Sequence, residues 1–308
     1  MGKNLSRRDA LQLMGFTGLS MISEPVSPLF SYNKAMLRRP IPSSGEQLPV
    51  VGLGTWIQFD AGESQSERVP LLQVLKNMNG IGGKVIDSSP MYGRSESVIG
   101  DLSTQLNKSD QFFYATKVWT QGREDGIEQM HASMKKMRRK TIDLMQVHNL
   151  IDWQTHLKTL RQWKEQGKIR YIGITHYIDS SHDELERIIN SEKPDFVQFN
   201  YSIRNRHAEQ RLLNVARDRG TAVIINQPFE SGNLFNAIRG KPLPPWASEY
   251  AINYWAQYFL KYLISNPAVN IVIPGTSDPM HIIENMQAAY EPLPDEKGRK
   301  KLIEYFEK

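Results

Sequence analysis

Short apolar segments of strand length recur along this chain and alternate with longer segments of helical periodicity. The strand-like segments are residues 50–53, 84–86, 112–116, 142–147, 170–174, 196–199, 222–225 and 270–273. Helical periodicity is clearest at residues 69–78, 124–137, 153–165 and 208–217. Because each helical crossover returns the chain to the same edge of the sheet, this order predicts a parallel sheet. Eight such strands can close into a (β/α)8 TIM barrel.

The competing fold is an open, doubly wound α/β sheet. Sheets of that kind that bind dinucleotides usually carry Gly-x-Gly-x-x-Gly after the first strand, whereas the first strand here reads VGLGTW without that fingerprint. A chain of 308 residues could hold two domains, but barrels of about 250 residues fold as one. We therefore predict a single barrel domain over residues 34–308.

The first 33 residues differ from the rest of the chain and are predicted to form a leader and connector. Arg7 and Arg8 precede a weakly apolar run that is too short to span a bilayer. The segment SRRDAL resembles the twin-arginine export signal, which predicts a periplasmic protein carried by the twin-arginine machinery. The alternative is an amphipathic N-terminal helix on a cytoplasmic protein, and no clear cleavage site decides the processing. Residues 24–47 are rich in Pro, Ser and Gly, which favours a connector closing in a short hairpin.

Composition limits the remaining classes of function. The net charge of +5 permits an anionic ligand but does not predict nucleic-acid binding, and the basic run at residues 135–140 is interpreted as a solvated helix end. The chain has no cysteine, which excludes disulfides and thiolate metal sites. Its seven histidines show no HxxxH or HExxH spacing, so we predict no metal site.

Polar side chains end three consecutive predicted strands. Asp87 ends the second strand, Lys117 the third and His148 the fourth, and a proline–glycine turn carries Tyr92 over the end of the second. Each has an ordinary structural explanation, such as a helix cap, a lysine reaching water or a core histidine. In a barrel, however, the carboxyl ends of the strands meet at one mouth. We therefore predict that these four side chains converge there.

The chemistry of the four side chains suits proton transfer to oxygen. A tyrosine has a pKa near 10, and a nearby ammonium is predicted to lower the pKa of Tyr92. Asp87 would keep Lys117 charged, and His148 would donate a hydrogen bond to a substrate oxygen. Together they predict a site that protonates a developing alkoxide while another group delivers a hydride.

Over residues 51–289 the chain resembles the aldo-keto reductase family. The motifs that carry the resemblance are GLGTW (52–56), VIDSSPMYGRSE (85–96), ATK (115–117), DLMQVH (143–148), GKIRYIGIT (167–175), VQFNYS (197–202) and IPGTSDPMHIIEN (273–285). The resemblance implies NAD(P)H-dependent reduction of an aldehyde or ketone, with NADP(H) expected in preference to NAD(H). It implies that Asp87, Tyr92, Lys117 and His148 are catalytic, with Tyr92 as the general acid.

The resemblance also implies the residues around the cofactor and the substrate. The implied cofactor-binding residues are Gly54, Thr55, Trp56, Asp87, Thr175, His176, Gln198, Gly275, Thr276, Ser277, His281, Glu284 and Asn285. The implied substrate-binding residues are Trp56, Tyr92 and His148. As large aromatic side chains, Trp56, Trp119 and Trp246 in the 232–248 insertion are candidates for an apolar wall of the substrate site, with packing in the core as the alternative. Asp278 and Pro279 read as the N-cap and first residue of a helix, whose N-terminus is suited to an anion.

Some positions depart from the family pattern. Thr175 replaces a usual Ser, His176 replaces a usual Asn, and Asn226 stands where an aromatic often stacks on the nicotinamide, with Phe229 as a substitute. Gly275 and His281 stand where basic residues commonly hold a 2′-phosphate.

These departures leave two alternative functions open. One is a nucleotide-binding regulator or partner subunit with little turnover. The other is a Schiff-base lyase using Lys117, which is disfavoured because a charged partner at Asp87 keeps the amine protonated.

Overall fold

The computed structural model describes residues 35–308, and the predicted leader with its export signal lies outside the described residues. Within this part of the chain, no helix combines the length and the hydrophobicity that crossing a bilayer requires. An antiparallel hairpin, β1 (Arg38–Pro40) with β2 (Gln47–Pro49), precedes the barrel, at the place where the connector was predicted to close in a hairpin.

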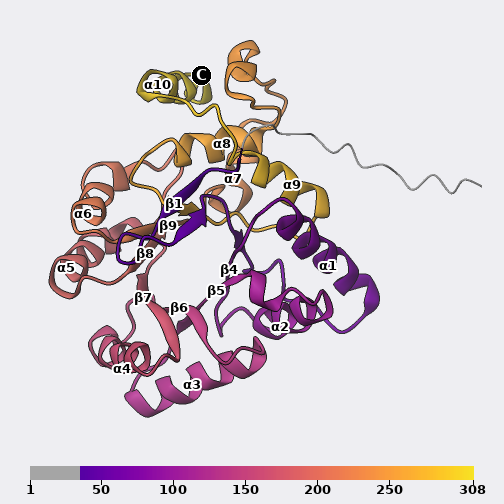
Figure 1. Ribbon diagram of the computed structural model, residues 1–308. Coiled ribbons are helices and arrows are strands. Elements are labelled where there is room, and N and C mark those ends of the chain that lie inside the picture. Colours follow the sequence, from indigo (N-terminus) through magenta and orange to yellow (C-terminus); the bar gives the residue numbers. More distant parts are fainter. Residues whose placement is uncertain (1–34) are drawn as a thin grey trace, which may run out of the picture. The chain divides into compact units, whose positions relative to one another are not determined.

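Eight parallel strands lie side by side in chain order at the centre of the described chain (Figure 1). They are β3 (Leu53–Gly54), β4 (Val85–Asp87), β5 (Phe113–Val118), β6 (Ile142–His148), β7 (Ile169–Thr175), β8 (Phe196–Asn200), β9 (Ala222–Asn226) and β10 (Ile271–Val272). All eight predicted strands are therefore present. The prediction of a single (β/α)8 barrel fold is confirmed.

The last strand closes the ring against the first. Val51 bridges to Val272 and Gly54 to Gly275, and the Gly52 amide donates to the Val272 carbonyl oxygen over 2.8 Å. A Cβ atom at Gly54 would lie 2.7 Å from the carbonyl oxygen of Ile273, so this close approach requires glycine. The Val50 carbonyl and the Gly52 amide both bond to Val272, and β3 itself begins at Leu53, later than the predicted strand at residues 50–53.

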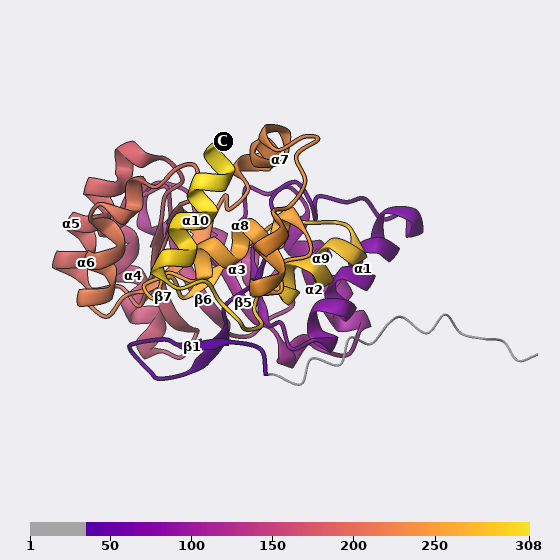
Figure 2. The same ribbon diagram turned by 90° about the horizontal axis from the view of Figure 1, so that it is seen from above.

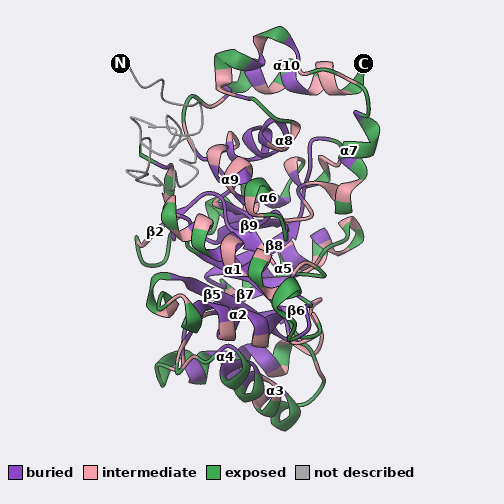
Figure 3. Ribbon diagram, turned by 90° about the vertical axis from the view of Figure 1, so that its right-hand side faces the viewer, coloured by how far each residue is buried: buried purple, intermediate pink, exposed green. Residues whose placement is uncertain are grey.

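Helices surround the barrel, with buried faces toward the strands and exposed faces outward (Figure 3). The α-helices are α1 (Gln65–Gly80), α2 (Ser95–Gln105), α3 (Arg123–Lys136), α4 (Trp153–Glu165), α5 (His182–Glu192), α6 (Leu212–Asp218), α7 (Asn233–Ala237), α8 (Trp255–Ile264), α9 (Pro279–Gln287) and α10 (Glu296–Glu307). The 3-10 helices are η1 (Ser109–Gln111), η2 (Asp179–Ser181), η3 (His207–Glu209), η4 (Glu230–Gly232) and η5 (Pro245–Tyr250). The insertion at 232–248 contains α7 and the start of η5, and residues 241–244 between them form no regular element.

The interior of the barrel is apolar at one end and polar at the other. Alternate residues of each strand point inward. The inward side chains near the strand starts, such as Phe113, Leu144 and Phe196, form one buried apolar cluster. Ile41 and Leu48 of the hairpin region join that cluster and close this end, opposite α7 (Figure 2). The polar side chains lie toward the carboxyl ends of the same strands.

Candidate active site

Asp87 and Lys117 form a buried ion pair between neighbouring strands. Asp87 ends β4 and pairs in register with Ala115, so Lys117 lies two residues further along β5 on the same inward face. Lys117 Nζ lies 2.6 Å from Asp87 Oδ2 and also donates to the carbonyl oxygen of Ser88 over 2.6 Å. Burial lowers the pKa of Lys117, but the charges and hydrogen bonds of Asp87 and Tyr92 together outweigh that effect, so that the pKa is raised. Lys117 therefore stays protonated, as predicted.

The second carboxylate oxygen of Asp87 accepts hydrogen bonds from two buried amides. Gln146 Nε2 and Gln198 Nε2 each donate to Asp87 Oδ1 over 3.0 Å. Gln146 fits because a Cβ at Gly173 would lie only 2.8 Å from its Cγ. The sequence analysis missed Gln146. A signal existed, since Gln146 precedes His148 by two residues and must share its inward face.

Tyr92 lies over the ion pair. Lys117 Nζ is 5.1 Å from the centre of the Tyr92 ring, and the ring meets that of His148 edge-on at 6.0 Å. Burial raises the pKa of Tyr92 above 10. Lys117 acts in the opposite direction through its charge and a hydrogen bond without reversing the shift. The sequence predicted the opposite direction, because it showed the neighbouring ammonium but not the packing that removes water.

His148 is neutral and faces the same space. Its Nδ1 lies 3.0 Å from Ser89 Oγ, and that hydroxyl oxygen also accepts from the Met91 amide. With Ser89 Oγ as the donor to Nδ1, the ring N–H of His148 stands on Nε2. Burial lowers the pKa of His148 to about 2, with smaller contributions from the charges of Lys117 and His176. The ring can donate one hydrogen bond at neutral pH.

A model described as the aldo/keto reductase family matches residues 50–300. The chain belongs to the aldo/keto reductase family. Its membership makes it an oxidoreductase by family, as predicted from the resemblance.

Two similar enzymes come from Escherichia coli. A methylglyoxal reductase is 27% identical over 259 residues, covering 81% of this aldo/keto reductase and 89% of the relative. An NADH-specific methylglyoxal reductase is 25% identical over 262 residues, covering 74% and 78%.

Solved structures share the fold. A thermostable aldo-keto reductase in complex with the inhibitor epalrestat superposes with a TM-score of 0.72 at 24% identity, covering 87% of this chain and 99% of that one. An aldo-keto reductase from Klebsiella pneumoniae in complex with NADPH gives 0.70 at 21% identity, covering 88% and 96%. At these identities the likeness supports the barrel fold alone.

In this aldo/keto reductase, two of the departures from the family pattern, His176 and Asn226, contact each other. Asn226 Nδ2 donates to the carbonyl oxygen of His176 over 3.0 Å, and Asn226 Oδ1 is buried without a hydrogen-bond partner among the described residues. The backbone amide of His176 donates to the Gln198 carbonyl oxygen. The Gln198 side chain is held inside the barrel, with its nitrogen on Asp87 and its oxygen accepting from Thr175 Oγ1 over 3.0 Å. This network orders the ends of β7, β8 and β9.

The start of α9 carries the predicted cap. Asp278 is the N-cap and Pro279 the first helical residue, and Asp278 Oδ1 accepts from the amides of Met280 over 2.6 Å and His281 over 3.3 Å. The hydrogen bond from the Met280 amide lowers the pKa of Asp278, so its carboxylate is charged. The helix N-terminus that was predicted to hold a phosphate thus already holds an anion of the chain itself.

A pocket of about 460 Å³ lies beside this helix start. Its lining includes Gln58, Asp60, Glu67, Ser277 and Asp278. Ser277 Oγ donates to Gln58 Oε1 over 3.1 Å, which links the segment after β3 to the turn before α9. Three of these five side chains are carboxylates.

The other predicted residues vary in accessibility. Glu284 is partly buried and Asn285 is buried, whereas His281 is exposed. Burial raises the pKa of Glu284, against the lowering effect of His281.

The predicted aromatic wall is only partly formed at the mouth. Trp56 follows β3 and is 52% exposed, and Trp119 follows β5 and is 41% exposed, so both can contact a substrate. Trp246 packs instead on Tyr250, Tyr258 and Tyr305. Phe229 packs edge-on against Phe235 and at a tilt on Phe259.

Proposed function

We propose that this chain is an NAD(P)H-dependent carbonyl reductase that converts an aldehyde or ketone to the alcohol. The observation that carries the proposal is the buried ammonium of Lys117, held 2.6 Å from Asp87 beneath the Tyr92 ring. Two E. coli relatives are named methylglyoxal reductases, so a small 2-oxoaldehyde such as methylglyoxal is the first substrate to test.

The four side chains have separate roles in this proposal. A bound NAD(P)H supplies the hydride to the carbonyl carbon. The hydroxyl of Tyr92 gives its proton to the carbonyl oxygen, and its raised pKa keeps that proton in place at neutral pH until the more basic alkoxide develops. Lys117, kept charged by Asp87, stabilises the tyrosinate that remains. His148 donates a hydrogen bond to the substrate oxygen.

The chain's residues fit a nicotinamide dinucleotide. Asn226 Oδ1 is a buried acceptor without a partner among the described residues, next to His176, and a carboxamide N–H would satisfy it. Thr276 and Ser277 offer hydroxyls at the turn before α9. Among the cofactor positions inferred from the family, Trp56 would lie nearest the substrate.

We propose NADP(H) as the preferred dinucleotide, with only a small preference. The support is His281 in the first turn of α9, a cation for a 2′-phosphate when protonated. The carboxylates of Asp60 and Asp278 around the neighbouring pocket act against a further phosphate. An Escherichia coli relative named as NADH-specific indicates that the family accommodates either dinucleotide.

Replacing Tyr92 by Phe tests the general acid. We expect Tyr92→Phe to lower kcat for methylglyoxal and other carbonyls by about 10²-fold or more, because only the proton donor is lost. Quenching of protein fluorescence by NADPH should be retained. Tyr254→Phe, at an exposed tyrosine outside the site, is the matched control and should keep full activity.

Equal turnover in wild type and Tyr92→Phe would refute the assigned acid. Quenching by NADPH without oxidation by any carbonyl in the wild type would support a nucleotide-binding regulator instead.

We also propose that residues 1–33 form a twin-arginine leader that directs the protein to the periplasm. The support is the SRRDAL motif alone. Cell fractionation that finds the protein only in the cytoplasm would contradict it.

A further inference from the structure

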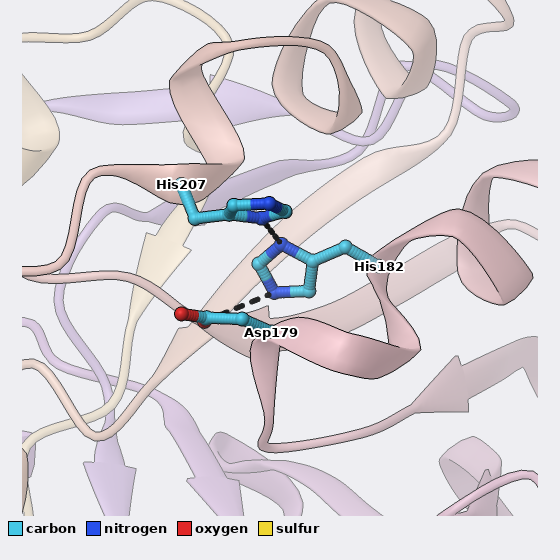
Figure 4. A group of neighbouring side chains, drawn as sticks. All are labelled: Asp179, His182 and His207. Carbon is cyan, nitrogen blue, oxygen red and sulfur yellow. Dashed lines mark hydrogen bonds and ion pairs between the residues drawn. The ribbon is translucent and has the colours of Figure 1, made fainter.

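Three side chains with metal-ligating atoms meet in the segments that follow β7 and β8 (Figure 4). Asp179 begins η2 and His182 begins α5, both in the segment after β7, whereas His207 begins η3 after β8. One ligand atom from each lies within 4.8 Å of the other two. Because the two histidines are 25 residues apart on different loops, the search for local histidine spacing did not detect them.

The hydrogen bonds around His182 decide which of its two ring nitrogens carries the hydrogen. Asn200 Nδ2 donates to Asp179 Oδ1 over 2.5 Å, and a charged carboxylate only accepts, so Asn200 Oδ1 must face His182. His182 Nε2 lies 3.0 Å from that amide oxygen and therefore carries the hydrogen. Nδ1 then accepts a hydrogen bond from Nδ1 of His207 over 2.9 Å, and a metal ion would bind there in place of that hydrogen. Metal-ligating histidines are typically held by such a hydrogen bond from the other nitrogen.

Asp179 is held in place in a similar way. Asn205 Nδ2 donates to both of its carboxylate oxygens, over 2.9 and 3.0 Å. These bonds use only part of the accepting capacity of the carboxylate, and Asp179 is only half-buried. His207 is exposed, so the cluster is open to solvent.

We propose that Asp179, His182 and His207 bind a divalent transition-metal ion such as Zn²⁺. Two nitrogens each about 2.1 Å from one ion lie about 3.4 Å apart in tetrahedral coordination, so the 2.9 Å pair must open by about half an ångström. The exposed His207 can make that movement. Ligands of one ion are at most about 4.2 Å apart. Asp179 Oδ1 lies 3.9 Å from Nε2 of His182, on the other side of the ring from His207, so the half-buried Asp179 carboxylate must turn toward Nδ1 to join the ion.

The bound ion would join the segment after β7 to the segment after β8. His176 lies at the end of β7 and the Gln198 side chain in β8, so the site is adjacent to the proposed cofactor residues but shares none of them. The inference therefore stands independently of the proposed reductase activity.

Calorimetric titration with ZnCl₂ tests the site on the untagged, chelator-treated full chain. We expect one Zn²⁺ per chain with micromolar or tighter affinity, and Co²⁺ in place of Zn²⁺ should give visible absorption bands of a nitrogen- and oxygen-ligated ion. His207→Ala and Asp179→Asn should each weaken binding at least tenfold. His131→Ala removes an exposed histidine that packs on Trp163 outside the cluster and should bind Zn²⁺ like the wild type.

Circular dichroism of the variants verifies that each is folded. The proposal is overturned if the wild type takes up no stoichiometric Zn²⁺ at about 100 μM, or if folded His207→Ala binds it as tightly as the wild type.

Discussion

Single side chains at the barrel mouth are held by protein groups rather than by water. The ammonium of Lys117 contacts a carboxylate and a carbonyl oxygen, and Asp87 accepts two further amide hydrogens. A buried charge without such partners would cost several kcal/mol. Ser88 Oγ and Gln146 Oε1 remain buried without hydrogen-bond partners among the described residues, so they are available to a bound molecule or water.

The low pKa of His148 predicts a pH dependence of stability. The folded state holds this pKa at about 2, whereas an ordinary histidine titrates near 6.5, so below pH 6.5 the unfolded chain binds a proton that the folded chain does not. The contribution of His148 is fully present above pH 6.5 and is lost as the pH falls. Between about pH 7.5 and 5 we expect the free energy of unfolding to drop about 2 kcal/mol more in wild type than in His148→Gln.

Guanidinium unfolding curves at the two pH values measure this difference. Equal losses in both proteins would mean that His148 is protonated in the folded state.

The sequence predicted the catalytic side chains but not all of their properties. Asp87, Lys117 and His148 could be found because they end consecutive strands, and Tyr92 because a turn follows one of them. The upward shift in the pKa of Tyr92 could not be predicted from the sequence, since it depends on how several strands and loops exclude water around one hydroxyl.

At the scale of elements, the start of α9 followed from the Asp278–Pro279 pair, because a capping carboxylate and a first-turn proline define a helix start. Contacts between elements did not follow. The Asn226–His176 hydrogen bond joins positions 50 residues apart, and the His182–His207 pair joins two loops. Local sequence patterns carry no information on such pairs.

The carboxylate that caps α9 is predicted to limit the use of NADPH. Asp278→Ser keeps a capping oxygen but removes the negative charge beside the pocket. If the dinucleotide phosphates bind near this turn, the ratio of kcat/KM with NADPH to that with NADH should rise about three- to tenfold. Asp295→Ser makes the same change at the N-cap of α10, where Asp295 accepts from the Gly298 amide, and should leave the ratio unchanged.

Steady-state kinetics with both dinucleotides give this ratio. An unchanged ratio in Asp278→Ser would place the 2′-phosphate away from the start of α9.

At the scale of the described molecule, the residues that stabilise the barrel and the residues of the candidate active site lie at opposite ends of the barrel axis. The inward side chains at the amino ends of the strands are apolar and closed off by the hairpin residues Ile41 and Leu48. The inward side chains at the carboxyl ends are charged or polar. In such a barrel, residues at the carboxyl ends of the strands can be substituted without repacking the apolar cluster at the amino ends.

This separation predicts opposite effects for substitutions at the two ends. Leu48 is 2% exposed within the interior cluster, so Leu48→Ala should lower the free energy of unfolding by about 2–5 kcal/mol while kcat/KM stays within about twofold. Trp119→Ala, at an exposed residue after β5, should lower kcat/KM and change stability by less than about 1 kcal/mol. Denaturation and kinetic measurements on both variants compare the two ends directly. A loss of kcat/KM in folded Leu48→Ala would show that the base of the barrel positions the proton donor at its mouth.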